Sequence, residues 1–227
     1  NSLTVSAAAE NTVATDAVTL QMQFGNLATR AYPELISRHN ELGLIQHARE
    51  AEQYLLSGIA AGSTAVTTTN LIGVGRDFLV QLGRAAAGYR SHHRLEADAP
   101  LRVIIPAWVK DAMAADLALA MPGDNTLDAY GEIDGYMASR GVNVSYSLDQ
   151  NVFGTQGEAA LLEFADSFTW YLFAEGTFLF LDGGTLDLGI IRDSSLVGTN
   201  DYKMFIETFE GIAKVGIEGL AITSTIN

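Results

Sequence analysis

The sequence from residue 168 to residue 191 reads FTWYLFAEGTFLFLDGGTLDLGII. Aromatic and large apolar residues dominate this stretch, and such residues are typical of β-strands. AEG at 174–176 interrupts the run, and DGG at 182–184 has the composition of a hairpin turn, because glycine tolerates the positive φ that such turns need. Further strands are predicted over residues 202–209 and 217–226. The pattern predicts an antiparallel sheet of about four or five strands with one face buried.

A long amphipathic helix is predicted over residues 33–61. Pro33 suits the first turn, where its missing N–H costs nothing, and Glu34 complements the positive end of the helix dipole. Apolar residues then recur at the spacings that one buried stripe requires. The stripe consists of Leu35, Leu42, Ile45, Ala48, Ala51, Leu55 and Ile59. Gly43 is expected to kink or divide this helix, and GST at 62–64 ends it.

Helices and strands are mixed in the middle of the chain. The predicted elements are a helix over 71–89, a strand over 101–105, a helix over 107–121, a helix from the capping residues 124–126 to Arg140, and a strand over 142–146. Gly141 is expected in the left-handed conformation that ends many helices. One more strand is predicted near residues 13–20, before the long helix. This order predicts an α+β chain.

The composition excludes several classes of function. The chain has 227 residues, no cysteine and a net charge of −14. Tight, sequence-independent binding of nucleic acid needs an excess of Lys and Arg, so it is not expected. The lack of cysteine excludes disulfides and cysteine-ligated zinc. No apolar run is long enough for a membrane helix, so no membrane partner is expected.

Several short motifs in the C-terminal part resemble one known family. They are AEGTF at 174–178, LDLGIIRDS at 186–194, TNDY at 199–202 and EG at 210–211. Their order and spacing resemble the C-terminal part of tailed-phage major capsid proteins, which have the Hong Kong 97-type fold. The resemblance implies a long spine helix on an antiparallel sheet, called the peripheral domain, and a mixed helix and strand axial domain.

The resemblance also implies how the chain is divided. Residues 1–66 would hold the N-terminal strand and the spine helix, residues 67–165 the axial domain, and residues 166–227 the C-terminal sheet of the peripheral domain. The strand over 101–105 and the helix that contains Trp108 resemble the corresponding axial elements. The family also has an N-terminal arm and an extended loop upstream of the spine helix. Only a remnant of these parts can fit before Gln21, so the extended loop, with a scaffolding segment, is expected to lie outside the sequence.

No catalytic, cofactor-binding or metal site is predicted from the titratable residues. His39 and His47 are too far apart for a helical metal pair, and His92 and His93 are adjacent, so their side chains are expected to point apart. The densest acidic cluster lacks the glycine and glutamate of a calcium loop and is interpreted as a solvated, capped helix face. It consists of Asp124, Asp128, Glu132 and Asp134. Nothing places Glu163 and Asp166 across a cleft as an acid and base pair.

The aromatic run offers candidate subunit-interface residues instead. They are Phe168, Trp170, Tyr171, Phe178 and Phe180. Both alternating faces of this run are apolar, which favours one face on the spine helix and part of the other against a neighbouring subunit. A platform for a ligand is the alternative interpretation.

The function predicted from the resemblance is structural and not enzymatic. Copies of the chain would form hexamers and pentamers of an icosahedral phage head around double-stranded DNA, which the acidic chain would enclose without specific binding. Further partners would be scaffolding, portal or decoration proteins, and the location would be the virion, after assembly in the host cytoplasm. Two alternatives stay open, namely an encapsulin-type nanocompartment shell and a soluble enzyme or ligand-binding domain.

Overall fold

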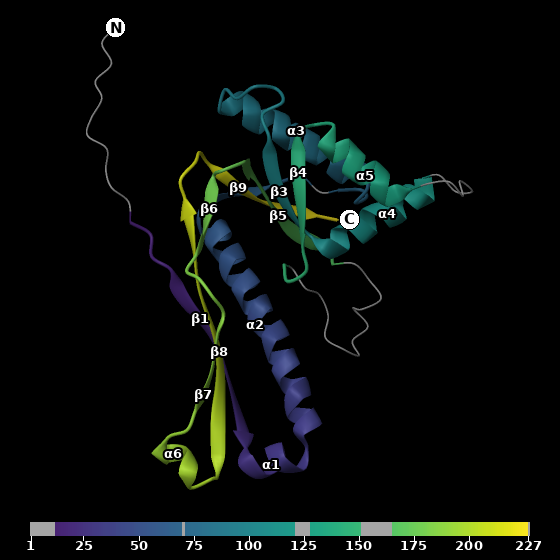
Figure 1. Ribbon diagram of the computed structural model, residues 1–227. Helices are drawn as coiled ribbons and strands as arrows, with labels where there is room; N and C mark the ends of the chain where they lie inside the picture. The colour runs from purple at the N-terminus through teal and green to yellow at the C-terminus, as the bar shows by residue number, and fades with distance from the viewer. Residues whose placement is uncertain (1–11, 70, 121–127, 151–164, 227) are drawn as a thin grey trace, which may run out of the picture. The chain divides into compact units, whose positions relative to one another are not determined.

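The computed structural model describes residues 12–69, 71–120, 128–150 and 165–226 (Figure 1). The chain forms two compact units. Unit 1 comprises Asn1–Ala51 and Phe180–Ala213, and unit 2 comprises Glu52–Leu179 and Lys214–Asn227. These bounds differ from the division expected from the resemblance, because residues 166–179 and 214–227 cluster with the predicted axial region, and the spine helix is divided between the two units after Ala51.

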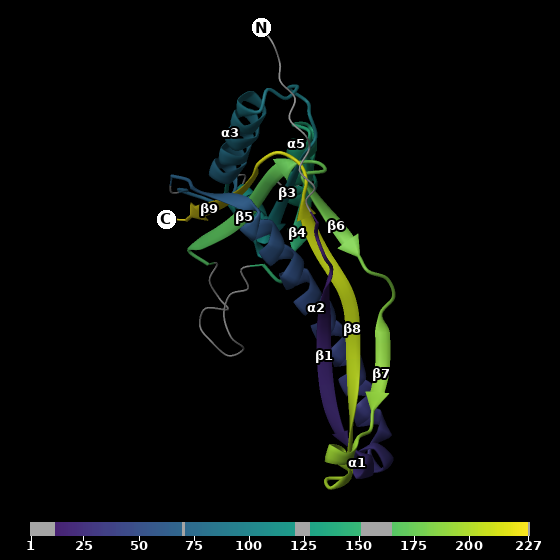
Figure 2. The same ribbon diagram turned by 90° about the vertical axis from the view of Figure 1, so that its left-hand side faces the viewer.

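Unit 1 contains a four-stranded antiparallel sheet built around one long strand. That strand, β8 (Asp201–Lys214), pairs with β1 (Asp16–Gly25) along one edge. Along its other edge it pairs with β6 (Phe178–Asp182) and then with β7 (Asp187–Ile191), as Figure 2 shows. Two short helices, α1 (Asn26–Ala31) and α6 (Ser194–Val197), lie next to strand ends.

The predicted hairpin at residues 182–184 is wrong. Gly184 does have a positive φ of 127°. However, β6 and β7 both use β8 as their partner, and the Gly183 N–H donates to the Phe209 carbonyl at 2.7 Å. The glycines therefore make a bend after which β7 pairs with β8, the strand that β6 also pairs with.

The helix α2 (Pro33–Ala61) has the predicted bounds and is continuous through Gly43, which corrects the expected kink. A Cβ at Gly43 would lie 2.6 Å from the terminal methyl carbon of Met22 on β1, so this glycine lets the helix approach the sheet closely. The His47 Nε2 lies 2.9 Å from the Val18 carbonyl oxygen of β1.

The buried face of α2 matches the predicted stripe only in part, because Ala51 and Ile59 are the predicted residues that are buried. Ile36, His47, Ala51 and Ile59 are buried, whereas Leu35, Leu42 and Ile45 are exposed. The apolar spacing admitted both choices, and the small Gly43 with the hydrogen-bonding His47 decided which face meets the sheet.

Unit 2 contains a five-stranded mixed sheet in the order β2-β9-β5-β3-β4. Its strands are β2 (Ser63–Thr67), β9 (Gly219–Thr225), β5 (Ser167–Ala174), β3 (Leu101–Pro106) and β4 (Val142–Ser147). The pairs β2 with β9 and β3 with β4 are parallel, and β5 runs antiparallel to both its neighbours. The strands predicted as one C-terminal sheet are therefore divided between two sheets, because β5 and β9 join this one.

The helices of unit 2 pack on this sheet through aromatic contacts. They are α3 (Arg76–His92), α4 (Ala107–Ala120) and α5 (Ala129–Ala138). The ring of Phe78 on α3 lies 5.3 Å from the rings of both Phe168 and Trp170 on β5. Trp170 is fully buried, and its indole N–H donates to the Ser224 hydroxyl at 3.0 Å. The face of β5 with Phe168 and Trp170 thus packs against α3. For the opposite face, packing on the spine helix stays a prediction.

Two helix ends of unit 2 follow simple local rules. Asp128 is the N-cap of α5 and accepts a hydrogen bond from the Gly131 N–H at 3.1 Å, as capping carboxylates do. The capping residues predicted at 124–126 lie outside the described residues. Gly141 has a φ of 66°, which confirms the expected left-handed position after this helix.

Replacing two glycines by alanine is expected to change the free energy of unfolding in opposite directions. The Phe205 ring on β8 occupies the space where a Cβ of Gly189 on β7 would lie, so Gly189→Ala is expected to lower the free energy of unfolding by about 1–3 kcal/mol. Gly135 on α5 faces open space, so the control Gly135→Ala is expected to raise it by up to about 1 kcal/mol. Urea unfolding measures both, and equal effects would contradict the packing of Phe205 on Gly189.

Candidate assembly surface

Three of the five predicted interface residues belong to the core of the chain. Phe168, Trp170 and Tyr171 on β5 are buried within unit 2 and have no free surface for a neighbour, which corrects the prediction for them. Phe178 is half-buried, and its ring lies 5.0 Å from that of Phe173. Phe180 is 54% exposed, so the prediction of an interface stays for this residue.

One group of exposed apolar side chains of unit 1 lies on β7 and directly before it. Leu186, Leu188 and Ile190 are 44%, 57% and 62% exposed, and we call these residues the β7 strip. Their alternation puts them on one face of the strand. Among the described strands β7 pairs with β8 alone, so its other edge is open. An open apolar edge strand is a place where another chain adds on.

The β7 strip has the chemistry of a protein-binding surface. Burying one large aliphatic side chain is worth about 1.5–3 kcal/mol. Three such side chains in a row, next to unpaired backbone groups, can therefore hold a partner by burial and by strand pairing. The sequence predicted a sheet with one face buried and gave no sign that this strand would be exposed.

The predicted titratable residues have structural partners. The His39 Nδ1 lies 2.8 Å from the Leu35 carbonyl oxygen on the same helix, apart from His47. The Asp134 carboxylate accepts from Lys110 at 2.7 Å and from the Tyr146 hydroxyl at 3.1 Å. Burial first, and then the charge of Asp134, raise the pKa of Tyr146 above its usual range.

The imagined acid and base pair finds no support. Glu163 lies outside the described residues, as does Asp124 of the acidic cluster. The backbone carbonyl of Asp166 accepts a hydrogen bond from the Ile226 N–H at 2.7 Å, which fixes the start of β5 to the end of β9. The role observed for Asp166 is thus that of a chain connection.

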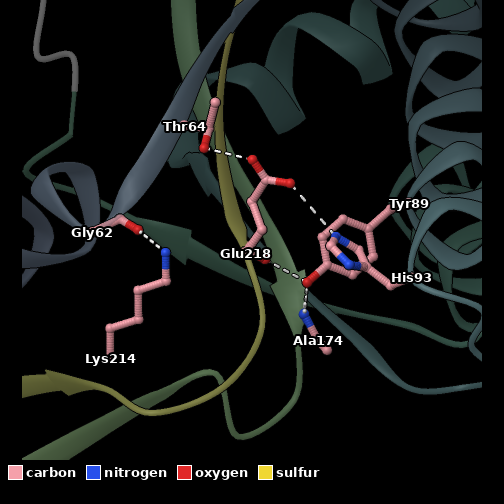
Figure 3. Close-up of polar contacts among 7 residues, drawn as sticks. All are labelled: Gly62, Thr64, Tyr89, His93, Ala174, Lys214 and Glu218. Atoms are coloured by element: carbon pink, nitrogen blue, oxygen red, sulfur yellow. Dashed lines mark hydrogen bonds and ion pairs between the residues drawn. The ribbon is translucent and has the colours of Figure 1, made fainter.

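Sequence reasoning missed a polar junction in unit 2, drawn in Figure 3. The Lys214 ammonium donates to the Gly62 carbonyl at 2.7 Å, just beyond the C-terminal end of α2. The Tyr89 hydroxyl donates to the Glu218 carbonyl at 2.5 Å and accepts from the Ala174 N–H at 3.2 Å. Burial raises the pKa of Tyr89. The junction connects the ends of α2 and α3 to the turn between β8 and β9.

The two adjacent histidines also differ from expectation. His92 and His93 have ring centroids 4.8 Å apart at an interplanar angle of 85°, so the rings meet instead of pointing apart. The turn between β8 and β9 brings Glu218 next to them. Nothing near these histidines in the sequence signals that carboxylate.

A hollow lies beside α3 in unit 2. Its volume is about 480 Å³, and Ala87, Ser91, Asp98 and Arg140 contribute to its lining. The Arg90 guanidinium, which also lines it, is held by backbone carbonyls of residues 99, 140 and 141. The Arg90 side chain therefore serves the fold. In the described residues, no helix is both long and apolar enough to cross a membrane.

The comparisons with known proteins give a consistent result at the level of structure. No family model and no curated protein match the sequence. A solved structure of Gordonia phage Cozz matches with a TM-score of 0.60 and 13% identity, over 100% of this chain and 78% of that one. The capsid of Myoviridae Phage XM1 matches with a TM-score of 0.58 and 10% identity, over 93% and 74%.

A third match comes from an archaeon. The virus-like particle from Pyrococcus furiosus has a TM-score of 0.56 and 11% identity, over 92% of this chain and 76% of that one. These likenesses confirm the fold expected from the resemblance. The chain has the Hong Kong 97-type fold of tailed-phage major capsid proteins, with α2 on an antiparallel sheet and a separate mixed unit.

Proposed function

We propose that the chain is a major capsid protein whose copies assemble into hexamers and pentamers of an icosahedral tailed-phage head. The observation that carries the proposal is the capsid fold of the chain. The β7 strip supports it, because an exposed apolar edge needs a covering partner, and a second copy is the partner that a shell supplies.

The contacts of such a shell are heterologous. The β7 strip of one copy would meet a different surface of the next, and rotation closes the ring when the angle fits. Many modest contacts, repeated around the shell, then resist pressure from inside without any single strong site. This mode of action needs no catalytic residue and no cofactor.

The charge of the chain suits enclosure of DNA. With a net charge of −14, the protein repels phosphates at moderate range and encloses double-stranded DNA without gripping it. The proposed location is the virion, with assembly in the host cytoplasm. Scaffolding, portal and decoration proteins are the proposed further partners.

A second candidate is the shell of an encapsulin-type nanocompartment, which holds cargo enzyme instead of DNA. The match to a virus-like particle from Pyrococcus furiosus is the observation that favours it. The two candidate shells would assemble through the same kind of subunit contacts and would differ in what they enclose. Nuclease protection of the enclosed material separates them, because a head holds protected DNA and a nanocompartment holds protein.

The third candidate, a soluble enzyme or ligand-binding domain, would use the hollow beside α3. Such a site needs polar groups that converge on a ligand. The Arg90 guanidinium instead donates to three backbone carbonyls, so it is committed to the fold. We therefore place this candidate below the two shells.

Assembly of the purified chain tests the proposal. Co-expression with a scaffolding protein is expected to yield closed particles in negative-stain microscopy, and sedimentation velocity is expected to show species far above the 24.3 kDa monomer. Monomers that persist at high concentration, with and without scaffold, would contradict a shell function.

A further inference from the structure

A cluster of metal-ligating side chains lies at the C-terminal end of α3. His92 ends this helix, His93 is its C-cap, and Glu218 comes from the turn between β8 and β9. One ligand atom of each residue lies within 4.8 Å of the others. We propose that His92, His93 and Glu218 bind a divalent transition metal ion such as Zn²⁺, with water as the fourth ligand.

The distances suit a tetrahedral site after a small movement. Zinc binds histidine nitrogen and carboxylate oxygen at about 2.0–2.2 Å, so ligand atoms of one ion lie roughly 3.3–3.6 Å apart. The His93 Nε2 and Glu218 Oε2 atoms are already 3.6 Å apart. His92 is exposed, so a rotation of its side chain can bring its ring nitrogen to the distance that a shared ion requires.

Neighbouring groups hold the carboxylate and the imidazole in place. The Thr64 hydroxyl on β2 donates to the Glu218 Oε1 at 2.6 Å, which leaves Oε2 directed to His93 (Figure 3). The Tyr89 hydroxyl donates to the Glu218 backbone carbonyl, and the Tyr89 ring lies 4.6 Å from the His93 ring. Such outer partners orient the ligands of metal sites and tune their affinity.

The electrostatic surroundings favour a cation. The C-terminal end of a helix carries a partial negative charge, and the chain as a whole is acidic. Arg90, one turn from the histidines, donates to the carbonyls of residues 99, 140 and 141. Lys214 donates to the Gly62 carbonyl at the end of the other helix. These two side chains therefore direct their donors to backbone carbonyls and not to the Glu218 carboxylate, and Arg94 is exposed to solvent.

The competing explanation is an ion pair without metal. A protonated His93 facing the Glu218 carboxylate at 3.6 Å accounts for two of the three residues. It gives no role to His92, whose ring meets that of His93 at 4.8 Å. A bound ion uses all three and links the end of α3 to the turn before β9. Both elements belong to unit 2, so the inference is independent of any assembly.

Metal binding by the purified chain tests the proposal. Competition for Zn²⁺ with a chromophoric chelator at pH 7.5 is expected to show one saturable site per chain, and thermal unfolding is expected to shift to higher temperature as Zn²⁺ is added. His93→Ala and Glu218→Gln are each expected to weaken binding by about 100-fold, and Thr64→Val by about 10-fold.

The controls separate a built site from casual binding. His39→Ala removes an exposed histidine of α2 and is expected to leave the affinity unchanged. Glu218→Gln retains an acceptor for Thr64, so circular dichroism is expected to show an intact fold. Lack of saturable binding, or affinity that survives Glu218→Gln or His92→Ala, would overturn the proposal and leave the ion pair of His93 and Glu218.

Discussion

Arg90→Met is expected to lower the free energy of unfolding by at least about 2 kcal/mol, because it removes the donor from the Ala99 and Arg140 carbonyls, whereas the Gly141 carbonyl keeps the Leu101 N–H at 3.0 Å. The guanidinium of this buried arginine donates to the Ala99 carbonyl from Nε at 3.0 Å and from Nη2 at 2.8 Å. The same Nη2 reaches the carbonyls of Arg140 at 2.8 Å and Gly141 at 3.2 Å. One side chain thereby joins α3 to the segments that precede β3 and β4.

The size of this effect depends on water. An unsatisfied buried carbonyl costs about 1–3 kcal/mol, and water reaching the hollow beside α3 lowers that cost, so we use the low end for each of the two carbonyls that lose their donor. The methylenes of methionine replace those of arginine, so packing is largely preserved. Urea denaturation of the purified protein, monitored by circular dichroism, measures the difference.

An exposed arginine provides the matched control. Arg38 pairs with Glu41 at 2.8 Å on the surface of α2, and both side chains are more than half exposed. Arg38→Met is expected to change the free energy of unfolding by less than about 0.5 kcal/mol. Arg90→Lys keeps a charge but has no fork of donors, so an intermediate loss is expected. An Arg90→Met protein as stable as Arg38→Met would contradict the structural role of Arg90.

Local signals in the sequence determined most element positions. Pro33 and the GST motif at 62–64 bracket α2, and Gly141 marks the end of the segment after α5, because these residues act through their own backbone preferences. The resemblance supplied the fold class, which the comparisons confirm.

Local sequence signals could not predict which strands and helices contact each other. The run at 168–173 was correctly predicted as a strand, yet its alternation does not say which helix covers it, and Phe78 of α3 does so. The DGG motif predicted a turn, but only the position of β8 decides whether the flanking strands pair with each other. An apolar residue is equally consistent with a core and an interface, so Trp170 was assigned to the wrong one.

The proposed metal site shows the same limit. His92 and His93 are adjacent in sequence, whereas Glu218 arrives from the far end of the chain through the pairing of β9 with β2 and β5. No spacing rule connects these residues. The β7 strip was only partly predictable, because its apolar residues are visible in the sequence but their exposure depends on β7 being the last described strand at that edge.

Ile190→Asp is expected to abolish particle assembly while the chain stays folded. Ile190 is 62% exposed in the single chain, so its replacement disturbs little, and the free energy of unfolding is expected to change by no more than about 0.5 kcal/mol. In a shell, the same position would be covered by the next copy. An unpaired carboxylate buried there costs several kcal/mol at each contact, and the shell repeats that contact around every ring.

Val215→Asp is the matched control, because it puts the same charge on an apolar side chain that is 66% exposed but lies outside the β7 strip. This variant is expected to assemble as the parent chain does. Sedimentation velocity and negative-stain microscopy of both variants measure the outcome, with circular dichroism to show that each is folded. If Ile190→Asp formed normal particles, the β7 strip would not be a subunit contact. The shell function itself is tested separately, by whether the parent chain assembles. If both variants failed, the loss would reflect added charge and not this strand.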